Sequence, residues 1–129
     1  MENVIKFIVG VGGGLASFLW GGWSALIQTL VLFIVIDYVF AVLVAASHGE
    51  LSSKKGFRGI AKKVAILVLV AVAHQIDNIT GGNNFVRDSV IFFFLANELI
   101  SILETCAKTG IPIPDALTKM VGVLKDKQK

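Results

Sequence analysis

Four apolar stretches separated by short polar segments set the pattern of this chain. Residues 24–46 read SALIQTLVLFIVIDYVFAVLVAA and hold Asp37 as their only formal charge. A helix needs roughly 20 mostly apolar residues to cross a bilayer. This stretch therefore predicts a transmembrane helix, and residues 59–75 and 88–107 predict two more.

The stretch 59–75 has a short apolar centre, VAILVLVAVA, at residues 64–73. Lys62 and Lys63 precede that centre, and long lysine side chains can reach the lipid headgroups from within a helix. We therefore count 59–75 as a span in spite of these two charges.

The fourth stretch, residues 4–23, is rich in glycine. Gly10 and Gly14 form a G-x-x-x-G pair, which lets two helix backbones approach closely in lipid. The same glycines suit a loose interfacial or re-entrant segment. The stretch predicts a membrane-associated helix that either spans the bilayer or lies in it.

The chain end predicts a surface helix over residues 114–126. Gly110 and Pro112 end the preceding span, and Pro114 suits a first helical turn. An apolar stripe at helical spacing follows, made by Leu117, Met120, Val121 and Leu124. This pattern is typical of an amphipathic helix on a membrane surface.

Composition supports lipid as the solvent. The 129 residues are 55% hydrophobic and only 16% charged, whereas a soluble domain carries about a quarter charged residues. The single cysteine, Cys106, excludes an internal disulfide and makes a cysteine-based metal site implausible. The fold class expected is all-α, a helical integral membrane protein with residues 1–129 as one membrane domain.

Basic residues predict the orientation. They gather in the segment between the first two strong spans, at Lys54, Lys55, Arg58, Lys62 and Lys63, and recur in the tail after residue 108. Segments rich in Lys and Arg stay in the cytoplasm. We expect this basic loop and the C-terminus inside and the 76–88 loop outside. The basic residues are not interleaved with aromatics, so no nucleic-acid partner is expected.

Polar residues within the apolar stretches are the candidate functional residues, because charge is costly in lipid. Asp37 predicts either a helix–helix hydrogen bond or a place on a water-filled lining. His74 and Asp77 lie three residues apart, on one helix face. They predict an interfacial capping pair or a polar contact to a neighbour.

The third span carries a polar stripe. Asn97, Ser101 and Glu104 follow helical spacing, and Glu98 lies on the flank of that stripe. A polar face of this length needs another helix, another subunit or water. No phosphate-binding loop, zinc-protease motif or nucleophile elbow occurs in the sequence. We expect neither an enzyme nor a cofactor or metal.

The order of these features resembles the toxin-secretion and phage-lysis holin family. The matching pieces, in chain order, are Asp37-Tyr38, SSKKGFRGIAKK at 52–63, His74 with Asp77, NELISILE at 97–104, and GIPIP from Gly110 followed by Leu117. Thr105 departs from the family pattern, which tends to carry Asn there.

The resemblance implies a multi-pass protein of the bacterial (host) cytoplasmic membrane. Its partners would be the lipid bilayer and further copies of itself, with which it oligomerises to permeabilise the membrane. An endolysin or a toxin then leaves the cytoplasm. The sequence fits two alternatives as well: a small ion channel or transporter subunit that passes no protein, and an assembly protein without a pore.

Overall fold

Five helices make up the chain, in agreement with the predicted all-α class. The computed structural model describes the backbone of residues 1–127 and the side chains of residues 1–123. The predicted stripe residue Leu124 and the lysines that follow it therefore lie outside the described side chains. The helices are α1 (Glu2–Trp20), α2 (Ala25–Ser47), α3 (Ser53–Thr80), α4 (Phe85–Lys108) and α5 (Asp115–Lys127).

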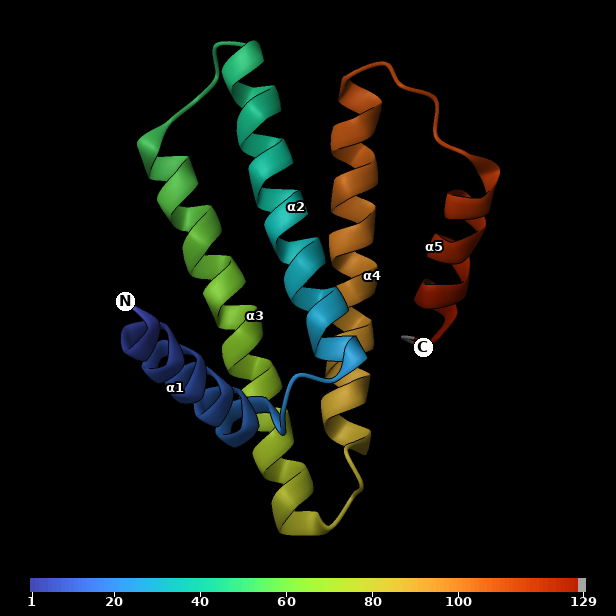
Figure 1. Ribbon diagram of the computed structural model, residues 1–129. Helices are drawn as coiled ribbons and strands as arrows, with labels where there is room; N and C mark the ends of the chain where they lie inside the picture. Colours follow the sequence, from blue (N-terminus) through green and yellow to red (C-terminus); the bar gives the residue numbers. More distant parts are fainter. Residues whose placement is uncertain (128–129) are drawn as a thin grey trace.

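Helices α2, α3 and α4 form the bundle that holds the core. Figure 1 shows α2 and α4 running in the same direction, with α3 returning between their two ends. The most extensive helix contact joins α2 to α4, and the contact of α2 with α3 is much smaller. The buried apolar core comes from these three helices: Ile27, Leu30, Ile34, Ile66, Val70, Ile91 and Leu95.

Local sequence explains where these helices begin and end. Ser24 and Ser52 each cap a helix by accepting a hydrogen bond from a backbone amide three residues later. Such caps satisfy amides that have no partner within the helix. Gly81 ends α3 in the left-handed conformation, with φ of 70°. Asn83 and Asn84 also have positive φ, so residues 81–84 form a tight turn between α3 and α4.

Helix α3 is longer than the predicted span 59–75, and the predicted basic loop is wrong. Lys54, Lys55, Arg58, Lys62 and Lys63 all lie on α3. Lys and Arg are good helix formers, and the Ser52 cap starts the helix ahead of them. The connection between α2 and α3 is only residues 48–52, and the predicted 76–88 loop shrinks to residues 81–84.

Helix α1 lies apart from the bundle and meets it only near its own C-terminal end (Figure 1). Ala16 is the residue that this helix buries. Gly10 and Gly14 are exposed, and a methyl group added at either would meet nothing within 4 Å. Their predicted role in packing between helices therefore stays a prediction.

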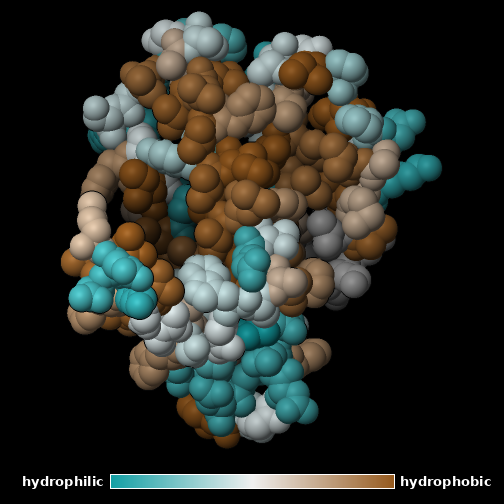
Figure 2. Space-filling view, in the orientation of Figure 1, coloured by the Kyte–Doolittle hydropathy of each residue, from teal (hydrophilic) through white to brown (hydrophobic). Residues whose placement is uncertain are grey.

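Three of the helices among the described residues are long and apolar enough to cross a membrane: α1, α2 and α4. The set differs from the three strong spans expected, because α1 is included and α3 is not. Large apolar side chains are exposed on all of them, and Figure 2 shows such side chains across the middle of one face. An exposed apolar surface of this extent suits contact with lipid.

Helix α5 follows the linker 109–114 and packs beside α4. Its bounds agree closely with the predicted surface helix over 114–126. Leu117 and Met120 are exposed on it, and their predicted contact with a membrane surface stays a prediction.

Candidate functional site

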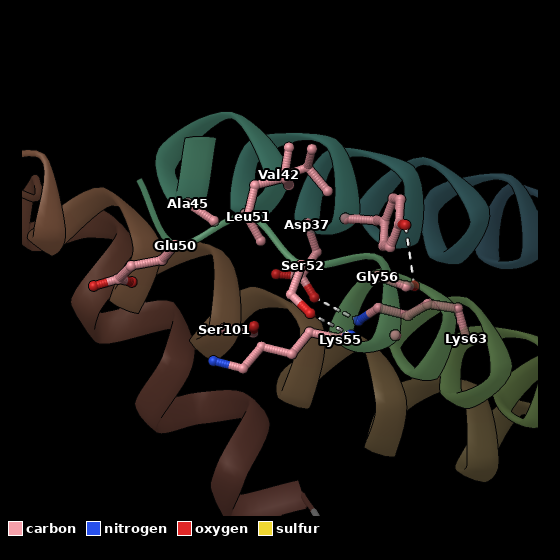
Figure 3. A pocket seen from close by; sticks show the side chains of 13 residues that line it. Asp37, Val42, Ala45, Glu50, Leu51, Ser52, Lys55, Gly56, Lys63 and Ser101 are labelled. Atoms are coloured by element: carbon pink, nitrogen blue, oxygen red, sulfur yellow. Dashed lines mark hydrogen bonds and ion pairs between the residues drawn. The ribbon is translucent and has the colours of Figure 1, made fainter. Parts of the chain in front are cut away.

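A buried ion triad joins the three bundle helices. Lys63 Nζ on α3 donates to Asp37 Oδ2 on α2 at 2.5 Å, and to both carboxylate oxygens of Glu98 on α4 at 2.7 Å. Asp37 is 4% exposed and Glu98 3% exposed. Figure 3 shows the lysine reaching across to Asp37 beneath the ribbon of α2.

The triad extends the apolar core by one helical turn. Asp37 comes three residues after Ile34 on α2, and Glu98 comes three residues after Leu95 on α4. Because α2 and α4 are parallel, this equal spacing brings both carboxylates to one level, facing α3. The two carboxylates are almost fully buried at this level, whereas the Lys63 side chain is 20% exposed.

The charges of the triad do not balance. When all three groups are ionised, two carboxylates face one ammonium, which leaves one net negative charge. A buried ion pair contributes little net stability, but removing one partner costs about 3–5 kcal/mol because the other charge stays buried. Asp37 Oδ1 is buried and has no hydrogen-bond partner among the described residues.

Tyr38 fixes α3 beside the triad. Its hydroxyl donates to the backbone oxygen of Gly56 at 3.1 Å. A Cβ atom at Gly59 would lie 3.2 Å from the Tyr38 ring, so the absence of a side chain lets the ring lie against α3. One face of α3 carries Gly56, Gly59 and Lys63. This face therefore provides both the surface that contacts the Tyr38 ring and the lysine of the triad.

A cavity of about 250 Å³ lies next to the triad, toward the 48–52 connection. Its lining combines charged and hydroxyl side chains with an apolar wall, as Figure 3 shows. Asp37, Lys63 and Ser101 line its inner part, whereas Glu50 and Lys55 line it nearer the connection and are exposed. The triad thus lies beside open space at one end and beside the apolar core at the other.

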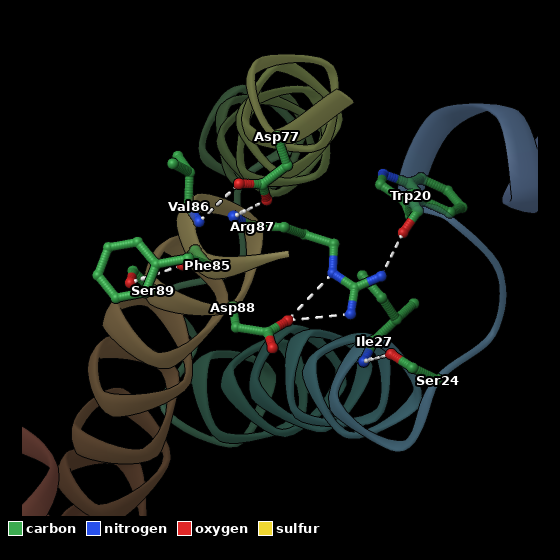
Figure 4. A network of polar contacts seen from close by, with 9 residues as sticks. All are labelled: Trp20, Ser24, Ile27, Asp77, Phe85, Val86, Arg87, Asp88 and Ser89. Carbon is green, nitrogen blue, oxygen red and sulfur yellow. Dashed lines mark hydrogen bonds and ion pairs between the residues drawn. The ribbon is translucent and has the colours of Figure 1, made fainter. Parts of the chain in front are cut away.

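A second polar cluster lies at the opposite end of α3. Asp77 accepts hydrogen bonds from the backbone amides of Val86 at 3.0 Å and Arg87 at 2.8 Å. The Arg87 guanidinium donates to the Trp20 carbonyl at 2.8 Å and pairs with Asp88 at 2.9 Å. Figure 4 shows this side chain between the ends of α1 and α4. The cluster fastens α1, α3 and α4 to one another.

His74 belongs to the same end of the bundle. It is 9% exposed, its Nε2 lies 3.4 Å from Asn78 Nδ2, and its Nδ1 has no partner among the described residues. Gly21 ends α1 with φ of 79°, and a Cβ there would lie 2.8 Å from the His74 ring. Only glycine fits this backbone without moving the ring.

The remaining predicted residues separate into buried and exposed groups. Asn97 and Glu104, which the sequence places on the main polar stripe, are exposed, and Ser101 is half-buried. The stripe is therefore not the face that α4 buries in the bundle. Glu98, on the flank of that stripe, points inward because the Ile91–Leu95 face turns it toward α3.

Lys63 is the residue whose contact the sequence analysis missed. It was expected to extend to the lipid headgroups, but its ammonium points into the bundle. Lys62, its neighbour, is exposed. The available signal was the face shared by Gly56, Gly59 and Lys63, since two glycines mark a close approach by another helix. Sequence reasoning also missed the contacts of Arg87.

Within residues 1–123, no group of three or more His, Cys, Asp or Glu side chains is placed to hold a metal ion. What the triad offers is a charge cluster inside helices that lipid surrounds. Such clusters mark ion pathways and helix contacts in membrane proteins.

Comparison with known proteins identifies the family. The bacteriophage holin family matches residues 14–126. An uncharacterized protein of Listeria monocytogenes is 50% identical over 127 residues, covering 98% of this chain and 91% of that protein. An uncharacterized 14.9 kDa protein in the nagH 3′ region of Clostridium perfringens is 37% identical, over 99% of this chain and all of its own length.

A probable holin of Bacillus phage phi105 is 33% identical over 109 residues, covering 84% of this chain and 80% of its own length. No solved structure matches. The family is not one of enzymes, and three helices among the described residues of this chain are long and apolar enough to cross a membrane. This chain is a multi-pass membrane protein that belongs to the bacteriophage holin family.

Proposed function

We propose that this protein is a working holin of the bacterial cytoplasmic membrane. It accumulates, oligomerises and then permeabilises the membrane, so that an endolysin or a toxin leaves the cytoplasm. Family membership and the relative named a probable holin support this role.

The observation that carries the proposal is the ion triad within an apolar bundle. A stable structural bundle gains little from two carboxylates and one lysine in its centre. These three groups are useful to a protein that first inserts without permeabilising the membrane and later admits water. When the three groups pair with one another inside the bundle, the bundle is stable in lipid. In an assembly the same groups can face water.

The directions of the helices support a crossing of the membrane by α3, whereas the composition of α3 alone does not. Because α2 and α4 run parallel, the chain must return across the same distance between them. Two lysines, Lys62 and Lys63, lie in the N-terminal half of α3. Lys62 is exposed, whereas Lys63 pairs with two carboxylates inside the bundle. The cost of placing this lysine at membrane depth is therefore reduced.

Basic residues support the orientation proposed. The 48–52 connection, the first turns of α3 and the linker after α4 lie at one end of the bundle (Figure 1). Lys54, Lys55, Arg58 and Lys108 lie at this end, so we place it and the C-terminus in the cytoplasm. A cysteine introduced at Glu50, in a Cys106→Ser background, should react with an impermeant maleimide only after the cells are opened.

The exposed glycines of α1 support packing between copies. Gly10 and Gly14 have free space in the single chain, and small residues four apart allow close helix contacts in lipid. Replacing both by Ile should weaken the oligomers captured by chemical crosslinking, whereas Gly122→Ala on α5 serves as the control. Unaltered oligomers in the double variant would remove α1 from the assembly.

The deciding experiment expresses the protein in bacteria together with a muralytic enzyme that has no export signal of its own. Membrane potential and enzyme release are followed in the same culture. A holin produces an abrupt depolarisation followed by enzyme release and lysis. Depolarisation without release indicates an ion channel instead, and no depolarisation indicates an assembly protein without a pore.

A further inference from the structure

We propose that α3 is the helix that moves during permeabilisation, and that Lys63 is the latch that holds it closed. This inference rests on the proposed holin function. The two ends of α3 are fastened by different means, and the fastening near Lys63 consists of groups that water or another subunit can replace.

At the end near the 81–84 turn, α3 is held by backbone partners. Asp77 accepts hydrogen bonds from two backbone amides at the start of α4. The turn itself joins α3 to α4 through only four residues. These contacts resist separation, because their loss would leave buried backbone groups without partners.

In its N-terminal half, α3 meets α2 through the Lys63 ion pair with Asp37 and the Tyr38 ring on the two glycines. The Lys63 ammonium also holds α3 to Glu98 on α4. Lys63 and Asp77 are 14 residues apart, or about 21 Å along the helix at 1.5 Å per residue. A small rotation about the Asp77 end therefore moves the Lys63 end by several ångströms.

Helices α2 and α4 stay together in this motion. Their interface is the largest in the bundle and is apolar, with Ile34 and Leu95 one turn before the two carboxylates. When α3 leaves, Asp37 and Glu98 face outward from the α2–α4 pair without a counter-charge. In lipid this state is unfavourable, and water or the lysine of a neighbouring copy makes it favourable. Opening therefore depends on the number of copies that have gathered.

Reversible crosslinking tests the inference in proteoliposomes that contain a self-quenched dye. Two variants are made in a Cys106→Ser background. Tyr38→Cys with Gly59→Cys ties α3 to α2, and Ile34→Cys with Leu95→Cys ties α2 to α4 as the control. A short bis-methanethiosulfonate bridges each pair through disulfides that a reducing agent removes, and mass spectrometry gives the crosslinked fraction.

We expect the α3–α2 bridge to reduce dye release by at least ten-fold, with full recovery after the bridge is reduced. The α2–α4 bridge should leave dye release within two-fold of the Cys106→Ser parent. Equal release with the α3–α2 bridge in place would overturn the latch, as would equal block by both bridges. A parent that releases no dye would contradict the proposed function itself, which separates the two failures.

Discussion

The two polar clusters on α3 use the same kinds of side chain in opposite ways. Near the 81–84 turn, the Asp77 carboxylate is occupied by two backbone amides that belong to the start of α4. At the triad, Asp37 and Glu98 share the ammonium of Lys63 as their hydrogen-bond donor. The Asp77 cluster stabilises the fold, whereas the triad places charged groups in the bundle that the fold alone does not require.

This difference separates stability from function. A carboxylate bound to backbone amides can be lost only by loosening the chain, so its removal should lower stability first. A carboxylate bound to a lysine side chain can change its partner while both helices stay intact. Substitutions in the two clusters should therefore affect different measurements.

The largest effect is expected for Lys63→Met. The change leaves two carboxylates buried without a cation and should destabilise the closed bundle by about 3–5 kcal/mol. Cells should depolarise well before those that express the parent at equal protein level. Lys62→Met, one position away on an exposed site, is the matched control and should depolarise on the parent's schedule. Identical timing in the two variants would remove Lys63 from the mechanism.

A smaller effect on timing is expected for Glu98→Gln. Lys63 donates to both Glu98 oxygens, but the glutamine amide keeps only one acceptor oxygen, at a cost of about 1–3 kcal/mol. Insertion should be intact and lysis should begin earlier. Glu104→Gln removes a charge from an exposed site on the same helix and should change the timing less. A larger shift in lysis timing for Glu104→Gln would indicate that the exposed polar stripe, and not Glu98, controls the timing.

Asp77→Ala tests the other cluster. It leaves two amides at the start of α4 without acceptors and should cost about 1–2 kcal/mol, as the loss of a helix cap does. Thermal unfolding in detergent should occur at lower temperature, while Asp115→Ala, on exposed α5, should not alter it. If Asp77→Ala advances lysis as strongly as Lys63→Met, the proposed division between the clusters is wrong.

The smallest effect is expected for Tyr38→Phe. The ring keeps its contact with Gly59, and only the hydrogen bond to the Gly56 carbonyl is lost. Such a bond contributes about 0.5–1.5 kcal/mol. Dye release should rise slightly, and Gly59→Leu, which displaces the ring, should raise it more. If Tyr38→Phe released more dye than Gly59→Leu, this result would contradict the packing role of the ring.

Sequence reasoning predicted most of the fold. The spans at 24–46 and 88–107 and the surface helix at 114–126 correspond closely to α2, α4 and α5, because apolar length and helical spacing are local signals. Helix α3 was too short in the prediction. Its charged first turns resemble a cytoplasmic loop when α2 and α4 are not considered.

The site was predicted only in part. Asp37 and Glu98 were recognised as costly in lipid, but the position of their partner depends on which face α3 turns toward them. That face is fixed by the Tyr38 ring on Gly56 and Gly59, a contact between residues distant in sequence. Single-helix periodicity contains no such information, and so Lys63 was assigned to the headgroups.

The central claim is that Asp37 and Lys63 act as one unit inside the bundle. A double-mutant cycle measures this directly, from the thermal unfolding in detergent of the parent, Asp37→Asn, Lys63→Met and the double variant. We predict that the double variant is more stable than the two single effects summed, by a coupling energy of about 2 kcal/mol or more. Additive effects, with a coupling energy near zero, would contradict the account.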